Sequence, residues 1–126
     1  MTKDPVKIGR INTRIEKAID YDFGDNIFCY ITEDTLREFV AKWPKDYLRK
    51  VEEASNIIKD PHYVGIDEEG RLLYFIKDYL VKNQCFRKAC IIMDFSRQLN
   101  LRNIISFDDK KMVELAKTTK FYSIRS

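Results

Sequence analysis

The residues that most clearly indicate a chemical function are the positively charged side chains in the C-terminal part of the chain. Residues 81–126 carry 10 basic and 4 acidic side chains, whereas residues 1–60 carry 11 basic and 12 acidic side chains. Positive side chains on one face attract the phosphates of a nucleic-acid backbone. The asymmetry therefore indicates either a phosphate-binding face or a solvated, lysine-rich surface, and charge alone does not separate the two.

Histidine and cysteine, the usual ligands of structural zinc, are scarce. The chain has one histidine, His62, and three cysteines, Cys29, Cys85 and Cys90, without CxxC spacing. With a single histidine and no CxxC spacing, the chain offers too few plausible ligands for a structural zinc site, so we expect no metal and no cofactor. The odd number of cysteines predicts free thiols in a reducing cytoplasm. We expect His62 to be a surface or capping histidine.

The composition indicates an ordinary globular domain. The 126 residues are 44% hydrophobic and 34% charged, which is enough apolar material for one modest core. No apolar run approaches the roughly 20 residues that cross a bilayer. The N-terminal segment MTKDPVKIG lacks the apolar region of a signal peptide. We therefore expect a cytoplasmic protein that does not contact membranes.

Two consecutive helices between residues 32 and 60 organise the rest of the chain. Thr32 is a favourable N-cap because its hydroxyl can accept a bond from a free backbone N–H. The first helix carries one apolar stripe at helical spacing: Leu36, Phe39, Val40 and Trp43. Pro44 cannot continue this helix but suits the first position of a second helix, which Asp60 and Pro61 end.

Runs of β-branched and aromatic residues predict four sequential strands after the helices. They are Tyr63–Ile66, Arg71–Asp78, Arg87–Phe95 and Leu99–Phe107. The turn at 67–70 joins the first two strands, and residues 79–86 are expected to be an irregular connection. Short turns require antiparallel neighbours, since parallel strands need long crossovers.

These elements predict an α+β fold in a single domain spanning 1–126. Two N-terminal helices would pack on a four-stranded antiparallel sheet, followed by a C-terminal helix within 108–118 that Asp108 caps. Shorter elements are expected at 12–19 (helix), 27–31 (strand) and 121–124 (edge strand). We also expect basic side chains to gather on the face of the sheet that the helices leave uncovered.

Four short motifs carry a resemblance to a known family. They are Leu36–Pro44, Pro61–Gly65, Leu73–Lys77 and Leu101–Ile105. Together they resemble the first helix, the Pro-Asp-Tyr-Val-Gly segment, the Ile-Glu-Tyr-Val-Lys strand and the closing Val-Arg-Thr strand of the phage and mobile-element branch of the barnase–EndoU–colicin–RelE-like (BECR) nucleases. The resemblance covers about residues 27–107. Glu38 and Trp43 stand where this family has two histidines, and Asn103 stands at its threonine.

The resemblance implies metal-independent cleavage of RNA. Such cleavage activates a ribose 2′-OH, stabilises a phosphorane and protonates the leaving oxygen, so it needs a base, an acid and cations. Arg102 and Lys77 match basic positions of the family and would act on the phosphate. Glu38 would serve as the base, as a carboxylate does in barnase-like members, and Asn103 would complete the site.

Two hypotheses follow from this resemblance. In the first, the chain is a small ribonuclease that acts through these four residues. In the second, the substituted histidines leave an inactive nuclease-like module that binds nucleic acid or a protein partner. In both, Arg87, Lys88 and Arg97 would add positive charge for nucleic-acid binding.

Overall fold

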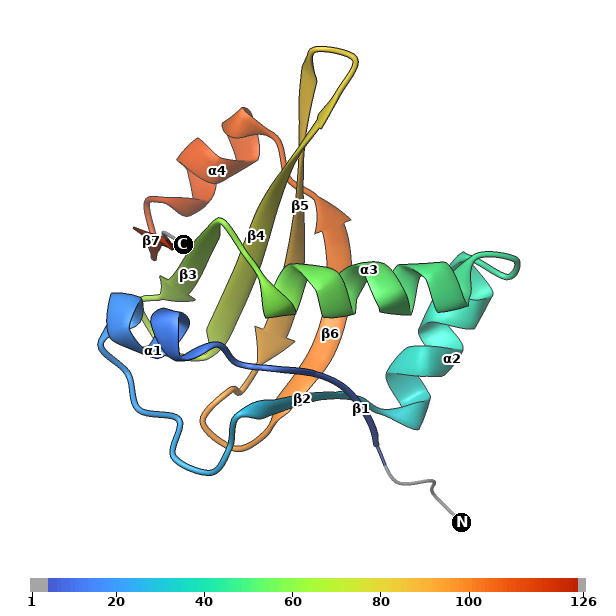
Figure 1. Ribbon diagram of the computed structural model, residues 1–126, viewed down its shortest axis with the longest axis horizontal. Coiled ribbons are helices and arrows are strands. Elements are labelled where there is room, and N and C mark those ends of the chain that lie inside the picture. Colours follow the sequence, from blue (N-terminus) through green and yellow to red (C-terminus); the bar gives the residue numbers. More distant parts are fainter. Residues whose placement is uncertain (1–4, 125–126) are drawn as a thin grey trace.

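A mixed seven-stranded sheet and four helices make up the part of the chain that the computed structural model describes, residues 5–124 (Figure 1). The elements, in chain order, are β1 (Val6–Arg10), α1 (Thr13–Ile19), β2 (Phe28–Ile31), α2 (Glu33–Lys42), α3 (Tyr47–Lys59), β3 (Tyr63–Asp67), β4 (Leu72–Val81), β5 (Gln84–Met93), β6 (Leu99–Ser106), α4 (Asp109–Leu115) and β7 (Thr119–Ser123).

The predicted four-stranded antiparallel sheet is wrong, although the four strands β3 to β6 do form an antiparallel meander. The strand order is β1-β2-β6-β5-β4-β3-β7. β1 and β7 extend the sheet at its two edges, and β2 pairs with β6 in parallel. A parallel pair is sterically allowed here because a long crossover, from α2 to β5, separates the two strands.

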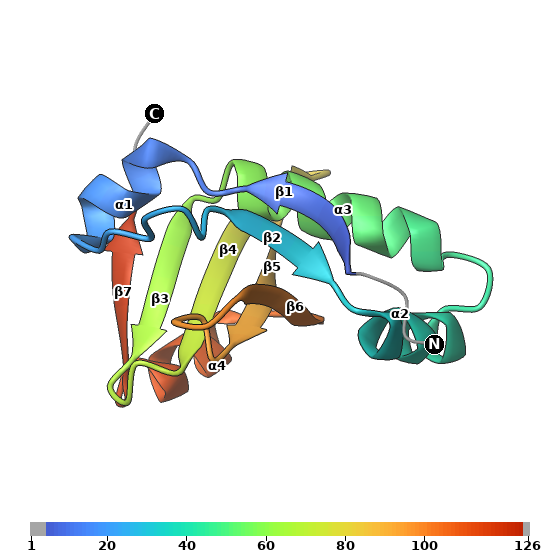
Figure 2. The same ribbon diagram turned by 90° about the horizontal axis from the view of Figure 1, so that it is seen from below.

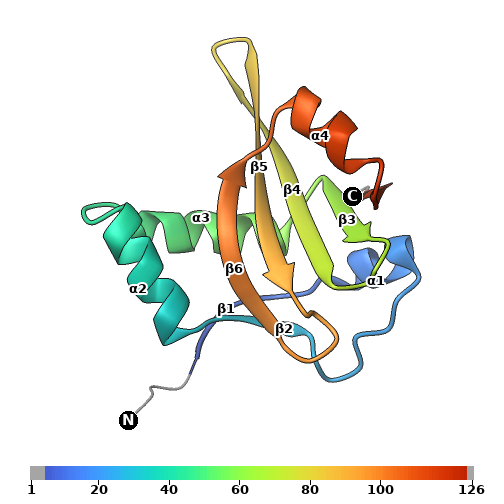
Figure 3. The ribbon, with the colours of Figure 1, turned by 180° about the vertical axis from the view of Figure 1, so that it is seen from behind.

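Helices lie over both faces of the sheet, with α1 and α3 on one side and α4 on the other (Figure 2). Alternate residues of β4 point to opposite faces, so Leu73 and Phe75 join the larger core, whereas Tyr74 and Ile76 join the smaller core beneath α4. α4 covers only part of the second face, since no helix lies in front of β6 in Figure 3, so the expectation that cations gather on an uncovered face stays a prediction.

Local capping signals confirm parts of the helix prediction. The Thr32 hydroxyl accepts a hydrogen bond from the Thr35 N–H at 3.2 Å, and the Asp108 carboxylate accepts one from the Lys111 N–H at 2.8 Å. Pro44 does not begin α3; residues 44–46 form a turn, and the helix begins at Tyr47. Within the described residues, no helix combines the length and the apolar character needed to cross a bilayer.

The predicted irregular connection at 79–86 is instead the end of a long hairpin. β4 and β5 pair over their full length, from Leu72–Met93 to Val81–Gln84. Lys82 and Asn83 form the turn with φ values of 50° and 64°, the left-handed conformation that two-residue hairpins favour. The usual Asn-Gly signal for this turn is missing from the sequence. The hairpin end projects beyond the rest of the sheet (Figure 3).

Candidate functional site

A cleft of about 320 Å³ lies between α2 and β6 and brings several predicted site residues together. It is lined by Glu38, Phe39, Lys42, Arg102 and Asn103. Three of the four predicted catalytic residues therefore meet here, although the strand and helix that carry them are about 60 residues apart in sequence. We call this hollow the α2–β6 cleft.

The position of α2 follows from the short pairing between β2 and β6. β2 pairs with β6 only through Cys29–Leu99 and Tyr30–Asn100. The chain then turns at Thr32 directly into α2, which therefore lies beside the later part of β6 in place of a strand. Phe39 of α2 is 2% exposed and anchors the helix in the main core. One flank of the cleft is thus an amphipathic helix held by its apolar side.

Arg102 reaches the cleft because β6 contains a bulge. Leu101 pairs with Ile92 of β5, whereas Asn103 pairs with the adjacent Ile91, which leaves Arg102 as an extra residue between them. A bulge interrupts the alternation of side chains and redirects one of them away from the regular face. Leu101 remains fully buried while Arg102 is exposed, so the bulge delivers a guanidinium to the surface without disturbing the core.

The polar contacts of the cleft are few and accessible to solvent. Nη1 of Arg102 lies 3.9 Å from Oε1 of Glu38, and both side chains are about half exposed, at 52% and 58%. Exposed ion pairs of this kind contribute only ~0–1 kcal/mol, so an anion can compete for the arginine. Nζ of Lys42 donates to Oδ1 of Asn103 at 3.5 Å, and the same oxygen accepts from the Ile104 N–H at 2.9 Å.

Lys42 was not predicted from the sequence as a site residue. It lies four positions after Glu38 on α2, a spacing that places both side chains on one face of a helix. That spacing is the signal that could have identified it. Lys42 and Arg102 together give the cleft two cations against the one carboxylate of Glu38, which leaves a net positive charge suited to a phosphate group.

Lys77, the fourth predicted catalytic residue, does not join the cleft. It belongs to β4, and β5 lies between β4 and β6 in the sheet. Its ammonium group lies 3.9 Å from Oδ2 of Asp60, at the end of α3, and its side chain is 22% exposed. Lys77 therefore belongs to the α3 side of the sheet, where its charge is matched by a carboxylate.

Two of the three residues predicted to bind nucleic acid are engaged in ion pairs. Nε and Nη1 of Arg87 lie 2.7 Å from carboxylate oxygens of Asp78 and Asp109, and hydrogen bonding to Asp78 is the largest cause that raises the pKa of Arg87. Nζ of Lys88 lies 2.5 Å from Oε1 of Glu53. Arg97, in the turn before β6, is exposed.

His62 and two of the three cysteines hold structural positions. Nδ1 of His62 accepts a hydrogen bond from the Asp78 N–H at 2.9 Å, so this histidine caps backbone as predicted. The three cysteines are free thiols, with Cys29 and Cys90 buried and Cys85 exposed. Burial raises the pKa of Cys29 to about 12. Among the described residues, no group of three or more histidine, cysteine, aspartate or glutamate side chains is placed to hold a metal ion.

The arrangement in the α2–β6 cleft can bind an anion and, in principle, can exchange a proton through its carboxylate or its ammonium group. Comparison with known proteins adds no assignment, since no family model, curated protein or solved structure matches this chain. The resemblance to the BECR nucleases therefore stays a prediction that rests on the four motifs of the sequence.

Proposed function

We propose that this protein binds RNA through the α2–β6 cleft, with Arg102 and Lys42 contacting a phosphate, and that it does not cut the strand. The observation that carries the proposal is the bulge on β6, which places Arg102 opposite Lys42 at the surface. Bulges frequently redirect side chains at functional sites. The cleft is at the small end of ligand sites, which span ~300–1,000 Å³, so it suits one nucleotide unit of a longer strand.

Binding is favoured over cleavage because the ionisable groups of the cleft remain in contact with water. Catalytic acids and bases usually work in sites that exclude water and hold them in place. Glu38 and Arg102 are each more than half exposed, and their 3.9 Å contact is too long for a fixed hydrogen bond. The one histidine of the chain, His62, uses Nδ1 to hold backbone outside this cleft.

Ribonuclease activity is the second candidate, and one observation favours it. Glu38, Lys42 and Arg102 supply a carboxylate, an ammonium group and a guanidinium in one cleft. A base, an acid and a charge stabiliser are the three groups that metal-independent cleavage requires. The same preparation can therefore be assayed for binding and for strand scission.

The test measures fluorescence anisotropy of a 5′-labelled oligouridine over about 50 to 200 mM salt in the presence of EDTA. For a single strand, each phosphate contact contributes a slope of about −0.7 to the dependence of log affinity on log salt. We expect Arg102→Ala and Lys42→Ala each to reduce the slope by about that amount. Lys17→Ala is the matched control, because α1 lies at the end of the sheet away from α2 (Figure 2).

Three outcomes would overturn the proposal. Absence of binding at the lowest salt would remove RNA as the ligand. Equal slopes for Arg102→Ala and Lys17→Ala would show that affinity depends on overall charge and not on the cleft. Scission of the RNA by wild-type protein, lost in Glu38→Gln on a denaturing gel, would replace the binding function with ribonuclease activity.

A further inference from the structure

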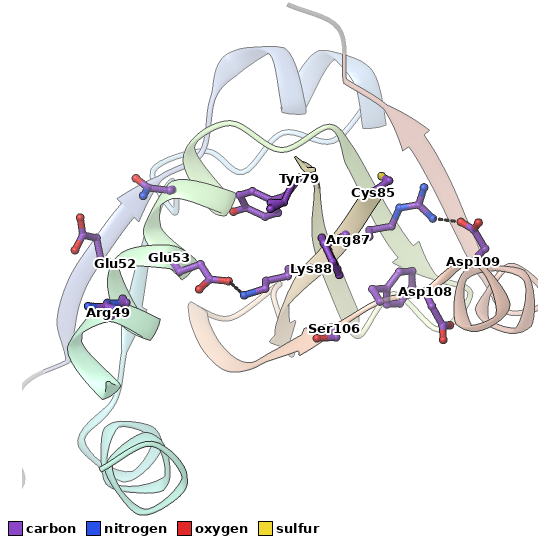
Figure 4. Close-up of a pocket in the computed structure, with 14 residues that line it drawn as sticks. Arg49, Glu52, Glu53, Tyr79, Cys85, Arg87, Lys88, Ser106, Asp108 and Asp109 are labelled. Atoms are coloured by element: carbon purple, nitrogen blue, oxygen red, sulfur yellow. Dashed lines mark hydrogen bonds and ion pairs between the residues drawn. The ribbon is translucent and has the colours of Figure 1, made fainter. Parts of the chain in front are cut away.

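A second and larger hollow, of about 990 Å³, lies beside the end of the β4–β5 hairpin (Figure 4). α3 forms one side of it, and the segment from Ser106 to Asp109, where β6 ends and α4 begins, forms the other. Its apolar lining comes from the hairpin and from the residue after β6: Tyr79, Val81, Phe86 and Phe107. We call this hollow the hairpin groove; it shares no lining residue with the α2–β6 cleft.

The hairpin groove contains the free edge of a strand. β6 ends at Ser106, which pairs with Lys88, and the Phe107 N–H donates to the Arg87 carbonyl at 2.8 Å. From there to the turn, β5 continues through Gln84 with β4 as its strand partner on one side. The sheet position next to residues 84–86 is thus vacated by β6.

The backbone of Cys85 faces this vacated position. In an antiparallel pair, the N–H and C=O groups of successive residues point alternately to the two sides of the strand. The Arg87 carbonyl points towards β6, because it accepts from Phe107, so the N–H and C=O of Cys85, two residues earlier, point to the same side. Unpaired groups on a strand edge are a template for another strand.

We propose that an extended segment of a partner protein adds to β5 in the hairpin groove, as a strand that occupies the position vacated by β6. An added strand would satisfy the backbone groups of Cys85, and its side chains would point alternately towards α3 and α4. Apolar surface is available on the hairpin, where Val81 is 51% and Phe86 is 47% exposed. Neither proline nor lysine, which commonly protect strand edges, occurs in the segment from Gln84 to Arg87.

The charges of the groove favour a peptide over a nucleic acid. Its lining residues include four acidic and three basic side chains. Arg87 and Lys88 are paired with carboxylates, and their side chains are only 16% and 30% exposed. The exposed rim therefore contains Glu52 and Asp108 opposite a single arginine, Arg49. This slight excess of negative charge disfavours phosphates and suits an extended peptide with apolar residues at alternate positions and a basic residue at one end.

The test uses random peptides of about twelve residues, displayed on phage and selected on the immobilised full-length chain. Enriched peptides are synthesised with a fluorescent label, and their affinities are measured by anisotropy. We expect Cys85→Pro to weaken binding by about fivefold or more, because proline removes the outward N–H. Cys85→Ser, the matched control, keeps that N–H and should bind like the wild type. Proline is tolerated at this position because the lost N–H makes no bond to β4.

A second measurement leaves the protein unchanged and alters the peptide. N-methylation of alternate backbone amides blocks strand pairing in one register and leaves the other register intact. We expect methylation of one set of amides to abolish binding and methylation of the alternate set to have little effect. This contrast decides the proposal even if Cys85→Pro lowers the thermal stability of the hairpin.

Several results would overturn strand addition. The selection could enrich no peptide, or the enriched peptides could bind the wild type and Cys85→Pro equally well. Equal effects of the two methylation patterns would mean that side chains alone dock in the groove. Loss of oligouridine binding in Cys85→Pro, with no loss in Arg102→Ala, would assign the groove to RNA.

Discussion

Replacing Gly65 with alanine tests why the third position of β3 carries no side chain. A Cβ atom there would lie 2.7 and 2.8 Å from two ring carbons of Phe121 and 3.0 Å from Cγ2 of Thr119. Non-bonded carbons pack at about 3.5–4.0 Å, so the Phe121 ring must shift by roughly 1 Å. This ring also packs edge-on against Phe107, with 6.3 Å between the ring centroids. The missing side chain of Gly65 thus makes room for the small core beneath α4.

The size of the effect follows from two opposing terms. Forcing a packed ring to move costs about 1–3 kcal/mol, whereas alanine is favoured over glycine in a strand by about 0.5–1 kcal/mol. Gly65 has no left-handed backbone that would add strain to the alanine. We therefore expect Gly65→Ala to lower the free energy of unfolding by roughly 0.5–2 kcal/mol, measured by urea denaturation followed by circular dichroism.

Repeating the substitution in a variant that lacks the Phe121 ring makes the test decisive. In Phe121→Ala the ring is absent and the remaining close contact, Cγ2 of Thr119 at 3.0 Å, must move by only a few tenths of an ångström, so Gly65→Ala should raise the free energy of unfolding by about 0.5 kcal/mol. The change in the free energy of unfolding caused by Gly65→Ala should therefore have opposite signs in the wild type and in Phe121→Ala. Equal destabilisation in both backgrounds would refute the steric explanation and would place the cost of the methyl group elsewhere in β3.

The remaining predictions concern the thiols and the hairpin turn. At pH 8 the native protein should react with Ellman's reagent at Cys85 alone, because Cys29 and Cys90 are fully buried; reaction of all three before unfolding would contradict their burial. Burial raises the pKa of Cys29 from 9.0 to about 12 and also raises that of Cys90. The free energy of unfolding should therefore fall above pH 9, by up to ~1.4 kcal/mol per pH unit for each buried thiol, because the unfolded chain releases protons that the folded chain keeps. Equal free energies of unfolding from urea titrations at pH 8 and pH 10 would contradict this pH dependence. Lys82 has a φ value of 50°, so Lys82→Asn should raise the free energy of unfolding by about 0.5–1 kcal/mol, and a lower melting temperature would count against the turn assignment.

The sequence contains local signals for most helices and strands of this fold, but it does not indicate which strands pair. The caps at Thr32 and Asp108 and the four strands of the meander follow from residue types within a few positions of each other. β1 escaped prediction because Ile8 is its single buried side chain and a register shift follows Lys7. β2 was expected as a strand, yet its parallel partner, β6, lies about 70 residues further along the chain.

The residues of the candidate site were likewise predictable only in part. The family resemblance identified Glu38, Arg102 and Asn103, and the structure places them in one cleft. Lys77 fails to join them because strand order, which residue periodicity does not encode, puts β5 between β4 and β6. The outward direction of Arg102 depends on a bulge, and no glycine or proline in β6 signals it.

Each of the two hollows forms where one strand continues beyond the end of its neighbour. On one side β6 loses its partner when β2 turns into α2, and the α2–β6 cleft forms there. At its end β6 stops while β5 continues to the turn, and the hairpin groove forms there. Both hollows therefore lie where the ladder of strands is interrupted. The first interruption is filled by a helix and offers cations, whereas the second leaves backbone groups free, so we infer that the two hollows select different chemical classes of ligand.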